Sequence, residues 1–214
     1  MNAIDWSLYA ILDQTYLAGR PLESLIEAAV AGGAGIIQLR YKSYHSAELY
    51  EAARQARAVT RRLGVPLIIN DRLDVALAVQ ADGVHLGQED LPHAVARDRL
   101  GRERWLGVSV HSLEEFERSR PANPDYYGVG TIYPSGTKET LPVKGIEVVR
   151  QLRPLTDKPL VAIGGLTPEN LAPVIQAGAD GVAVISALWR ADDVEARARE
   201  FVEAIAAART PSAA

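Results

Sequence analysis

The amino-acid sequence predicts an α/β protein built as a single (β/α)8 TIM barrel, and two observations support this fold class. Eight short apolar runs recur along the 214 residues, and longer amphipathic segments separate them. Runs that stay apolar at most positions are typical of strands buried on both faces of a parallel sheet. An open doubly wound sheet would need fewer or longer strand–helix units, so the barrel is favoured.

The expected strands are short and follow one another along the whole chain. We expect them at Leu8–Leu12, Ile36–Leu39, Leu67–Ile69, Gly83–Leu86, Trp105–Val108, Tyr126–Val129, Leu160–Ile163 and Gly181–Ile185. The amphipathic segments between them predict helices at Leu22–Ala31, Ala47–Leu63, Ile146–Leu152 and Pro168–Gln176, with a last helix from about Val194 to Ala208.

Helix-terminating and helix-starting residues stand where this scheme needs them. Ser112 precedes Glu115 by three residues, which is the spacing of a capping box. Thr167 stands before Pro168, a cap residue followed by proline at the first helical position. Glycine follows several expected helices, where a left-handed turn favours it, at Gly32–Gly33, Gly64 and Gly178.

Length and composition fit one compact domain. Hydrophobic residues make up 48% of the chain and charged residues 23%, which is ordinary for a globular protein. We expect the barrel to occupy residues 1–209, followed by a short flexible tail at residues 210–214. The chain has no cysteine, which excludes disulfides, thiolate catalysis and cysteine-bound zinc.

The net charge and the first residues of the chain restrict the kinds of binding partner that we expect. A formal net charge of −4 argues against a nucleic-acid binder, which usually carries a basic excess. The first residues lack the basic and apolar segments of a signal peptide, and no apolar run approaches the ~20 residues needed to cross a bilayer. We therefore expect a cytoplasmic protein with small-molecule partners, no nucleic acid and no membrane; the sequence leaves a homo-oligomer open.

Polar residues gather directly after the expected strands. The active site of such a barrel lies at the carboxyl ends of its strands, so these residues share one rim. The candidates that follow the second to sixth strands are Gln38, Arg40, Lys42, Asn70, Asp71, Asp90, Ser109 and the loop through Ser135, Thr137 and Lys138. Gly164–Gly165 follows the seventh strand and Ser186 the eighth.

The charged candidates indicate a diphosphate bound with a metal ion. Arg40, Lys42 and Lys138 supply positive charge and hydrogen-bond donors for phosphate oxygens. Asp71 and Asp90 follow neighbouring strands and suit magnesium, which takes one or two carboxylates together with water and substrate phosphate.

A second phosphate site is expected on the same rim. The glycines after the seventh strand and the backbone amides near 185–186 form a typical barrel phosphate site, aided by a helix amino terminus. Two anion sites on one rim imply two phosphorylated substrates, or one long one.

Each candidate also has a purely structural interpretation. Asn70, Asp71 and Asp90 could cap the helices that follow their strands, and Arg40 could pair with a carboxylate on the rim. Gly165 could serve only a tight turn. Their joint placement favours the functional interpretation, because caps do not require three cations that face two carboxylates.

Several motifs stand in register along most of the chain, from about Leu8 to Trp189. They are Gln-Leu-Arg-Tyr-Lys at 38–42, Ile-Ile-Asn-Asp-Arg at 68–72, Asp-Gly-Val-His-Leu-Gly-Gln-Glu-Asp at 82–90, Gly-Val-Ser-Val-His at 107–111, Ile-Gly-Gly at 163–165 and Val-Ile-Ser at 184–186. Together with the loop through Lys138, they resemble the thiamine phosphate synthase family.

The resemblance implies an Mg²⁺-dependent transferase that joins an aminopyrimidine diphosphate to a thiazole phosphate and releases pyrophosphate. It implies that the pyrimidine diphosphate is bound by Gln38, Leu39, Arg40, Tyr41, Lys42, Asn70, Ser109 and Lys138, of which Arg40, Lys42, Ser109 and Lys138 are catalytic. It further implies that Asp71 and Asp90 bind magnesium, and that the thiazole phosphate contacts Ser135, Gly136, Thr137, Gly165, Ile185 and Ser186.

Two alternatives stay open at this point. A thiazole tautomerase resembles the synthase and uses a histidine in a Ser-x-His stretch, where this chain has His111. Such an enzyme would not need Asp71 or Asp90, so the full metal and diphosphate set favours the synthase. A non-catalytic sensor of thiamine intermediates could keep the phosphate site and lose the metal ligands, which this chain retains.

Overall fold

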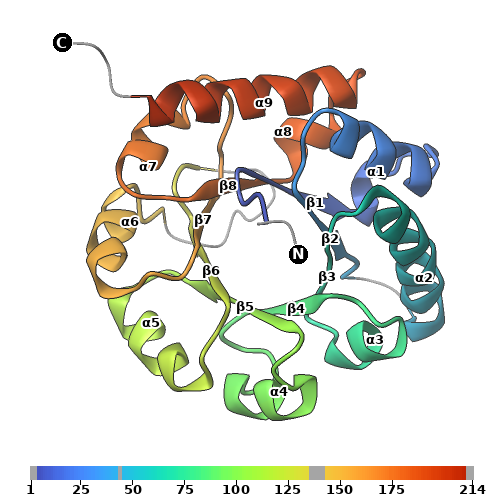
Figure 1. The fold of residues 1–214 in the computed structure, drawn as a ribbon, viewed down its shortest axis with the longest axis horizontal. Helices are drawn as coiled ribbons and strands as arrows, with labels where there is room; N and C mark the ends of the chain where they lie inside the picture. The colour runs from blue at the N-terminus through green and yellow to red at the C-terminus, as the bar shows by residue number, and fades with distance from the viewer. Residues whose placement is uncertain (1–3, 43–44, 135–142, 211–214) are drawn as a thin grey trace.

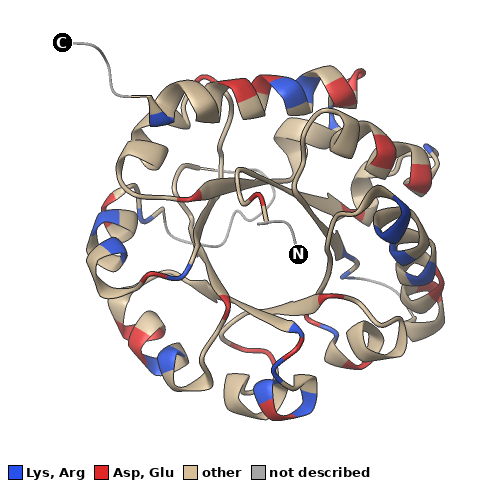
Figure 2. Cartoon of the chain, in the orientation of Figure 1, with Lys and Arg blue, Asp and Glu red and all other residues tan. Residues whose placement is uncertain are grey.

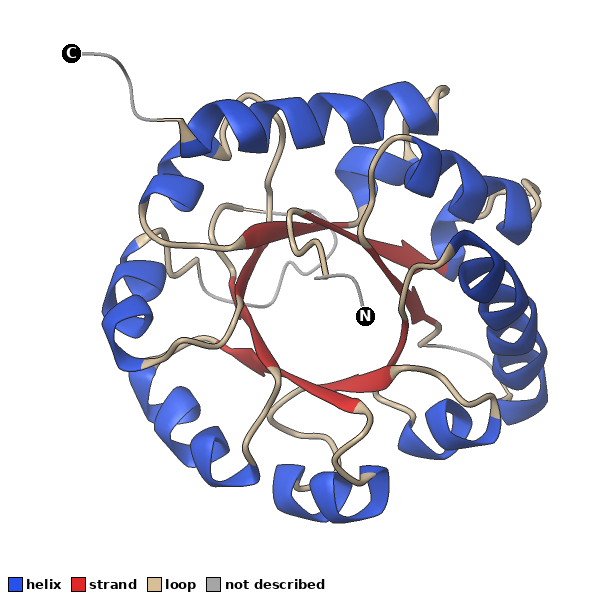
Figure 3. Ribbon diagram, in the orientation of Figure 1, coloured by secondary structure: helices blue, strands red, loops and turns tan. Residues whose placement is uncertain are grey.

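Eight parallel strands close into a barrel in the computed structural model, which describes residues 4–42, 45–134 and 143–210 (Figures 1 and 3). Each strand pairs with its neighbours in the sequence, and β8 pairs with β1. The (β/α)8 prediction is therefore confirmed. The strands are β1 Leu8–Asp13, β2 Ile36–Arg40, β3 Leu67–Asn70, β4 Gly83–Leu86, β5 Trp105–Val110, β6 Tyr126–Gly130, β7 Leu160–Ile163 and β8 Gly181–Val184.

The described helices surround the barrel on its outer side (Figure 3). They are α1 Leu22–Ala31, α2 Ser46–Leu63, α3 Leu73–Ala78, α4 His93–Leu100, α5 Leu113–Ser119, α6 Glu147–Leu152, α7 Ala172–Gln176, α8 Ser186–Trp189 and α9 Val194–Arg209, with 3-10 turns at Gln14–Tyr16, Arg120–Ala122 and Arg153–Leu155. Among the described residues, no helix combines the length and the apolar character needed to span a membrane.

One predicted helix start is wrong. We expected a helix from Pro168, but α7 begins at Ala172. The Asn170 side chain accepts a hydrogen bond from the Thr167 backbone N–H at 2.8 Å and donates one to the Gly165 carbonyl at 2.9 Å. Such side-chain bonds stabilise a turn in competition with helical hydrogen bonds. The Ser112 cap is confirmed, because its hydroxyl accepts the Glu115 N–H at 3.3 Å.

The alternation of side chains along each strand decides which residues enter the barrel. Successive residues point to opposite faces, so every second one lies inside. On β2, Gln38 and Arg40 line a pocket inside the barrel mouth, whereas Leu39 is fully buried and absent from that lining. The apolar core therefore has two parts, one inside the barrel and one between the strands and the helices.

The segment before β1 closes the amino-terminal end of the barrel. The Trp6 ring lies 5.4 Å from the ring of Trp105 and 5.0 Å from that of Tyr126, measured between centroids. Gly181 at the start of β8 accommodates this segment, because a Cβ atom there would lie 1.7 Å from the Trp6 carbonyl oxygen. Figure 1 shows this part of the chain lying within the outline of the barrel.

Three arginine–aspartate pairs recur around the same end, and we call them the floor pairs. Each aspartate carboxylate precedes an even-numbered strand and accepts a backbone N–H near the start of the strand before it, at 2.7 to 2.8 Å. The same carboxylate oxygen accepts from an arginine of the helical segment that precedes the odd-numbered strand, so each carboxylate has both a charged partner and a backbone partner. The pairs are Arg57–Asp82, Arg97–Asp125 and Arg153–Asp180. Figure 2 shows charged residues mainly on the helices and loops, with largely uncharged strands.

Candidate active site

Two adjoining pockets open at the carboxyl ends of the strands. The wider one, a cavity of about 200 Å³, lies over β5 to β8. Its lining includes Ser109, His111, Gly164, Gly165, Ile185 and Ser186. The narrower one leads into the barrel interior, and its lining includes Gln38, Arg40, Asn70, His85 and Ser109. Ser109 and Ile185 therefore line both pockets, whereas Gln38, Arg40 and Asn70 line only the narrower one and Gly165 and Ser186 only the wider one.

Arg40 is held at the rim by a carboxylate that the motif analysis did not single out. Its guanidinium makes an ion pair with Asp13 at the end of the neighbouring strand β1, where only 4% of Asp13 is exposed. Asp13 is itself held by the backbone N–H and the hydroxyl of Thr15, at 3.0 and 2.7 Å. The structural interpretation of Arg40 is thus correct in part. A guanidinium carries five N–H donors, however, and the Asp13 contact uses one of them.

Asp71 and Asp90 come together at the rim as predicted. Burial raises the pKa of Asp71, and the nearby carboxylate of Asp90 raises it further through repulsion and a side-chain hydrogen bond. The ammonium of Lys42 acts in the opposite direction, with its Nζ 3.7 Å from an Asp71 carboxylate oxygen. Two carboxylates this close attract a cation, since a positive charge between them relieves their repulsion.

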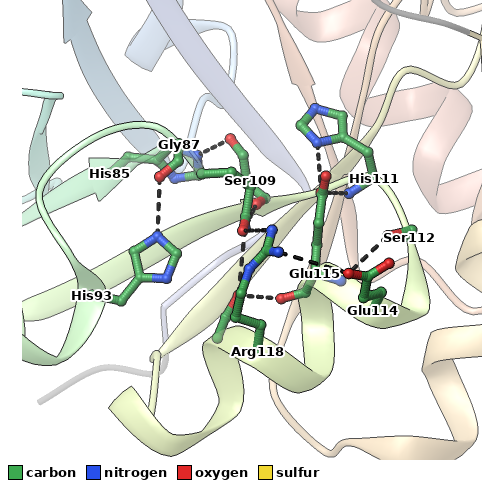
Figure 4. Close-up of polar contacts among 11 residues, drawn as sticks. His85, Gly87, His93, Ser109, His111, Ser112, Glu114, Glu115 and Arg118 are labelled. Carbon is green, nitrogen blue, oxygen red and sulfur yellow. Dashed lines mark hydrogen bonds and ion pairs between the residues drawn. The ribbon is translucent and has the colours of Figure 1, made fainter.

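The backbone around this pair is shaped to present the carboxylates. Asp71 has a φ of +62°, a left-handed conformation that aspartate tolerates better than most residues. Asp90 accepts the Gly87 backbone N–H at 2.6 Å, which fixes one of its oxygens. The Gly87 carbonyl in turn contacts the His93 Nε2 at 3.0 Å (Figure 4). Among the described residues, no group of three or more histidine, aspartate or glutamate side chains is arranged to hold a metal.

The wider pocket is lined by Gly164 and Gly165 and by His111, which pairs with Glu115. Gly165 has a φ of +62°, and a Cβ atom there would lie 2.4 Å from the Pro134 carbonyl oxygen, so any other residue would require the backbone at Pro134 to shift. On the opposite wall, the His111 Nδ1 lies 2.8 Å from the Glu115 carboxylate, which also accepts the His111 backbone N–H at 2.6 Å (Figure 4). The carboxylate orients the imidazole toward the pocket it lines.

Not every predicted residue joins these pockets. Leu39 packs between strand and helices, so its side chain cannot reach a ligand at the barrel mouth. Tyr41 is half-buried and packs against the core. Ser135, Gly136, Thr137 and Lys138 lie outside the described residues.

Several polar residues of the site were missed. Asp13, Tyr9 and Tyr126 lie within or next to apolar runs, where they are expected as core residues, and each is buried. His85 stands in the 82–90 motif and was given no role there, yet its Nε2 lies 2.8 Å from the Ser109 Oγ. Strand alternation could have found it, because His85 and Asn70 are register partners on β4 and β3.

Comparison with known proteins agrees with this geometry. A family model described as thiamine monophosphate synthase matches residues 8–188. The thiamine-phosphate synthase of Natronomonas pharaonis is 46% identical over 204 residues, which cover 94% of this chain and 95% of that protein. That of Moorella thermoacetica is 48% identical over 206 residues, covering 95% and 98%. The solved thiamine phosphate pyrophosphorylase from Pyrococcus furiosus superposes with a TM-score of 0.87 at 36% identity, covering 97% of this chain and 98% of that one.

These similarities span the whole barrel. The family model extends from the start of β1 into α8, and so includes every strand end that lines the two pockets. The identities of 46% and 48% hold over nearly the full length of both relatives. The chain therefore belongs to the thiamine phosphate synthase family, a family of transferases.

Proposed function

We propose that the chain is a cytoplasmic enzyme acting on two phosphorylated small molecules. It joins 4-amino-2-methyl-5-(diphosphooxymethyl)pyrimidine to 4-methyl-5-(2-phosphooxyethyl)thiazole, which gives thiamine phosphate and pyrophosphate. The observation that carries this proposal is the pair of adjoining pockets that share Ser109. Two substrates that react with each other need neighbouring sites, because catalysis of a bimolecular step depends on holding both in line.

The pyrimidine diphosphate belongs to the narrower pocket. Gln38, Asn70 and Ser109 line it with hydrogen-bonding side chains, and Arg40 adds a fixed positive charge. Lys42, whose Nζ lies 3.7 Å from Asp71, adds positive charge at the rim, and Lys138 is assigned to the same diphosphate. Leu39 takes part through backbone groups only, since its side chain is buried against the helices, and Tyr41 is assigned to the same substrate.

The thiazole phosphate belongs to the wider pocket. Gly165, Ile185 and Ser186 line it where the backbone between β7 and α8 can donate N–H groups to phosphate oxygens. Ser135, Gly136 and Thr137 are assigned to the same phosphate.

Asp71 and Asp90 are the residues that would hold magnesium. Their carboxylates lie close enough to raise the pKa of Asp71, and a hard cation prefers oxygen ligands of this kind. When bound, magnesium supplies positive charge that stabilises a departing diphosphate. Lys42, 3.7 Å from Asp71, is placed to share that task.

The chain's own residues then need only to orient the two substrates and stabilise the departing diphosphate. The bond between the pyrimidine methylene carbon and the diphosphate oxygen breaks, and its electron pair leaves with the oxygen. The thiazole nitrogen donates its lone pair to the methylene carbon, forming the new C–N bond. No side-chain nucleophile takes part; Arg40, Lys42, Ser109 and Lys138 stabilise the negative charge that develops on the leaving group.

The test is pyrophosphate release by the purified protein with both substrates and magnesium, each omitted in turn. Release only when all three are present, with an equal amount of thiamine phosphate, supports the proposal. Release that does not depend on the thiazole phosphate would indicate hydrolysis and contradict it.

The His111–Glu115 pair favours one second candidate, thiazole tautomerisation. A carboxylate-oriented histidine on the wall of the thiazole pocket has the geometry of a general acid–base group. Thiazole isomerisation that is lost in His111→Gln, without any pyrophosphate release, would establish this second activity in place of the first. It would also leave the Asp71–Asp90 pair without a role.

A further inference from the structure

A continuous series of buried hydrogen bonds crosses the barrel interior and ends at Ser109. The Gln38 Nε2 lies 2.8 Å from the Tyr9 hydroxyl, which lies 2.7 Å from the Tyr126 hydroxyl. The Tyr126 hydroxyl lies 2.9 Å from the His85 Nδ1, and the His85 Nε2 lies 2.8 Å from the Ser109 Oγ. Figure 4 shows the last of these contacts. Five different strands contribute to the series, so only the closed barrel assembles it.

Two glycines on the inner face of the barrel make room for this series. A Cβ atom at Gly107 on β5 would lie 2.1 Å from the Tyr126 ring, which could not then occupy its position. A Cβ atom at Gly128 on β6 would lie 3.0 Å from the His85 ring, tighter than ordinary contact. Below the series, Trp6 packs on the Tyr126 ring and closes the barrel floor. The rings are therefore held from both sides.

Counting protons gives the series a direction. Burial raises the pKa of both Tyr9 and Tyr126, so each hydroxyl keeps its single proton. With the Gln38 Nε2 donating to Tyr9, we assign the Tyr9 proton to Tyr126 and the Tyr126 proton to the His85 Nδ1, because each hydroxyl then donates one hydrogen bond within the series. An imidazole that accepts a hydrogen bond at Nδ1 carries its ring proton on Nε2.

Ser109 is the last member of the series. In this arrangement the His85 Nε2–H donates to the Ser109 Oγ, so the hydroxyl proton of Ser109 points elsewhere. Ser109 lines both pockets, and this proton is therefore available to a ligand at the point where the pockets meet.

We propose that Tyr9, Tyr126 and His85 are positioning residues that hold the Ser109 hydroxyl as a hydrogen-bond donor toward the substrate. This inference rests on the proposed function, in which negative charge develops on the diphosphate oxygen beside Ser109. A donor aimed at that oxygen stabilises the charge, whereas an acceptor would repel it. The reversed series, with Ser109 donating to His85, would leave Ser109 as an acceptor only.

The direction of the series is measured by the tautomer of His85. Uniformly ¹⁵N-histidine-labelled protein contains four histidines, and the His85 signals are identified by their loss in His85→Gln. We expect the proton on Nε2 and an unprotonated Nδ1 in the full-length protein without substrate. A proton on Nδ1 overturns the proposal, and this holds whichever reaction the enzyme catalyses.

The effect on catalysis is measured with Tyr126→Phe, which removes the donor to His85. We expect kcat to fall about tenfold, the usual size for one misdirected hydrogen bond, with an unchanged KM for the thiazole phosphate. Tyr127→Phe is the matched control, because Tyr127 is the next residue of β6, is equally buried and faces Phe116 among the helices. It should leave kcat unchanged. Tyr9→Phe interrupts the series one step earlier and serves as a second variant if Tyr126→Phe does not fold.

A double-mutant cycle separates positioning from general stability. Ser109→Ala alone should lower kcat about a hundredfold, as loss of a charge-stabilising donor does. Tyr126→Phe should then have no further effect on kcat in the Ser109→Ala background. Equal reductions in both backgrounds would show that Tyr126 acts independently of Ser109 and would overturn the proposal. If the parent protein forms no thiamine phosphate, the proposed function fails, while the His85 tautomer still decides the direction of the series.

Discussion

The two ends of the barrel use the same residue types in opposite ways. At the amino-terminal end, the floor pairs join each aspartate to an arginine and a backbone N–H. At the carboxyl-terminal end, Asp71 and Asp90 lie close together, and burial, followed by the charge of Asp90, raises the pKa of Asp71. Each floor aspartate has an arginine partner, whereas the rim sets two carboxylates beside the ammonium of Lys42, whose Nζ lies 3.7 Å from Asp71.

This difference distinguishes carboxylates that stabilise the fold from carboxylates that bind a ligand. A carboxylate with an arginine and an N–H on the same oxygen is already stabilised, so adding a ligand gains little. A pair of carboxylates held near each other costs stability until something binds between them. Changes at the floor should therefore reduce stability without changing catalysis. Changes at the rim should reduce catalysis without reducing stability.

The largest expected effect is on turnover at the rim. Asp71→Asn and Asp90→Asn should each lower kcat about a hundredfold or more, because the metal charge is worth several kcal/mol in such reactions. Asparagine is preferred to alanine because it tolerates the left-handed backbone at residue 71, with its φ of +62°. Turnover is measured over a magnesium titration, with circular dichroism as the fold control. Unchanged turnover at every magnesium concentration would remove both residues from the metal site.

At the floor, Asp125→Ala should lower stability. The change leaves Arg97 and the Leu106 N–H without their partner, in a pair whose side chains are only 16% and 32% exposed. We expect a loss of about 2 kcal/mol, less than for a fully buried pair, or about 6 °C in the unfolding midpoint. Both KM values should stay unchanged, which is the contrast with the rim. As a control, Glu51→Ala removes an exposed ion pair with Arg54 and should leave the midpoint unchanged. Equal midpoint shifts in the two variants would contradict the distinction.

Much of this contrast could be predicted from the sequence, because local pattern defines strands and the residues that follow them. The strands were placed within two residues of their observed ends, and Asp71, Asp90, Gln38, Asn70 and Ser109 were expected on one rim. The carboxyl ends of parallel strands must meet, so position after a strand is enough to assign a residue to the rim.

The rest depends on contacts between residues far apart in the chain. Tyr9 and Tyr126 are separated by 117 residues, and nothing near either one indicates that their hydroxyls meet. Asp13 binds Arg40 only because the register of β1 and β2 places the two side by side. The wrong helix start at Pro168 has a local cause instead, since the Asn170 side chain stabilises a turn that the cap-and-proline pattern does not reveal.

Gly165→Ala tests whether the glycine at the wider pocket serves more than a turn. Gly64→Ala is the matched control: both residues have positive φ, at +62° and +73°, but a Cβ atom at Gly64 would contact nothing within 4 Å. Alanine at Gly64 should cost about 1 kcal/mol from the backbone alone, without any change in KM. Alanine at Gly165 should cost more stability, since Pro134 must move, and should raise the KM for the thiazole phosphate several-fold. Equal stability losses in the two variants, with unchanged KM values, would show that Gly165 serves only the turn.

The smallest effect concerns the stability of the metal-free protein. The folded pKa of Asp71 is raised above its unfolded value of about 3.9, so the folded protein binds this proton more tightly than the unfolded chain. The resulting stabilisation is fully present below the unfolded pKa and is lost as pH rises through the folded pKa. At pH 7 the charged carboxyl therefore destabilises the fold, and Asp71→Asn in EDTA should raise the unfolding midpoint by about 2 °C.

Magnesium should make the parent protein more stable than Asp71→Asn. This reversal would show that the rim carboxylates bind the metal ion. Added magnesium stabilises the parent protein by binding only its folded state, whereas Asp71→Asn lacks one carboxylate and should gain little. The higher unfolding midpoint of Asp71→Asn in EDTA should also vanish below about pH 4. There the Asp71 carboxyl of the parent is protonated and as uncharged as the amide that replaces it. Thermal unfolding at pH 4 and pH 7, with and without magnesium, measures all of these outcomes. A variant that is less stable than the parent in EDTA at pH 7 would mean that Asp71, like the floor aspartates, is already satisfied by the fold.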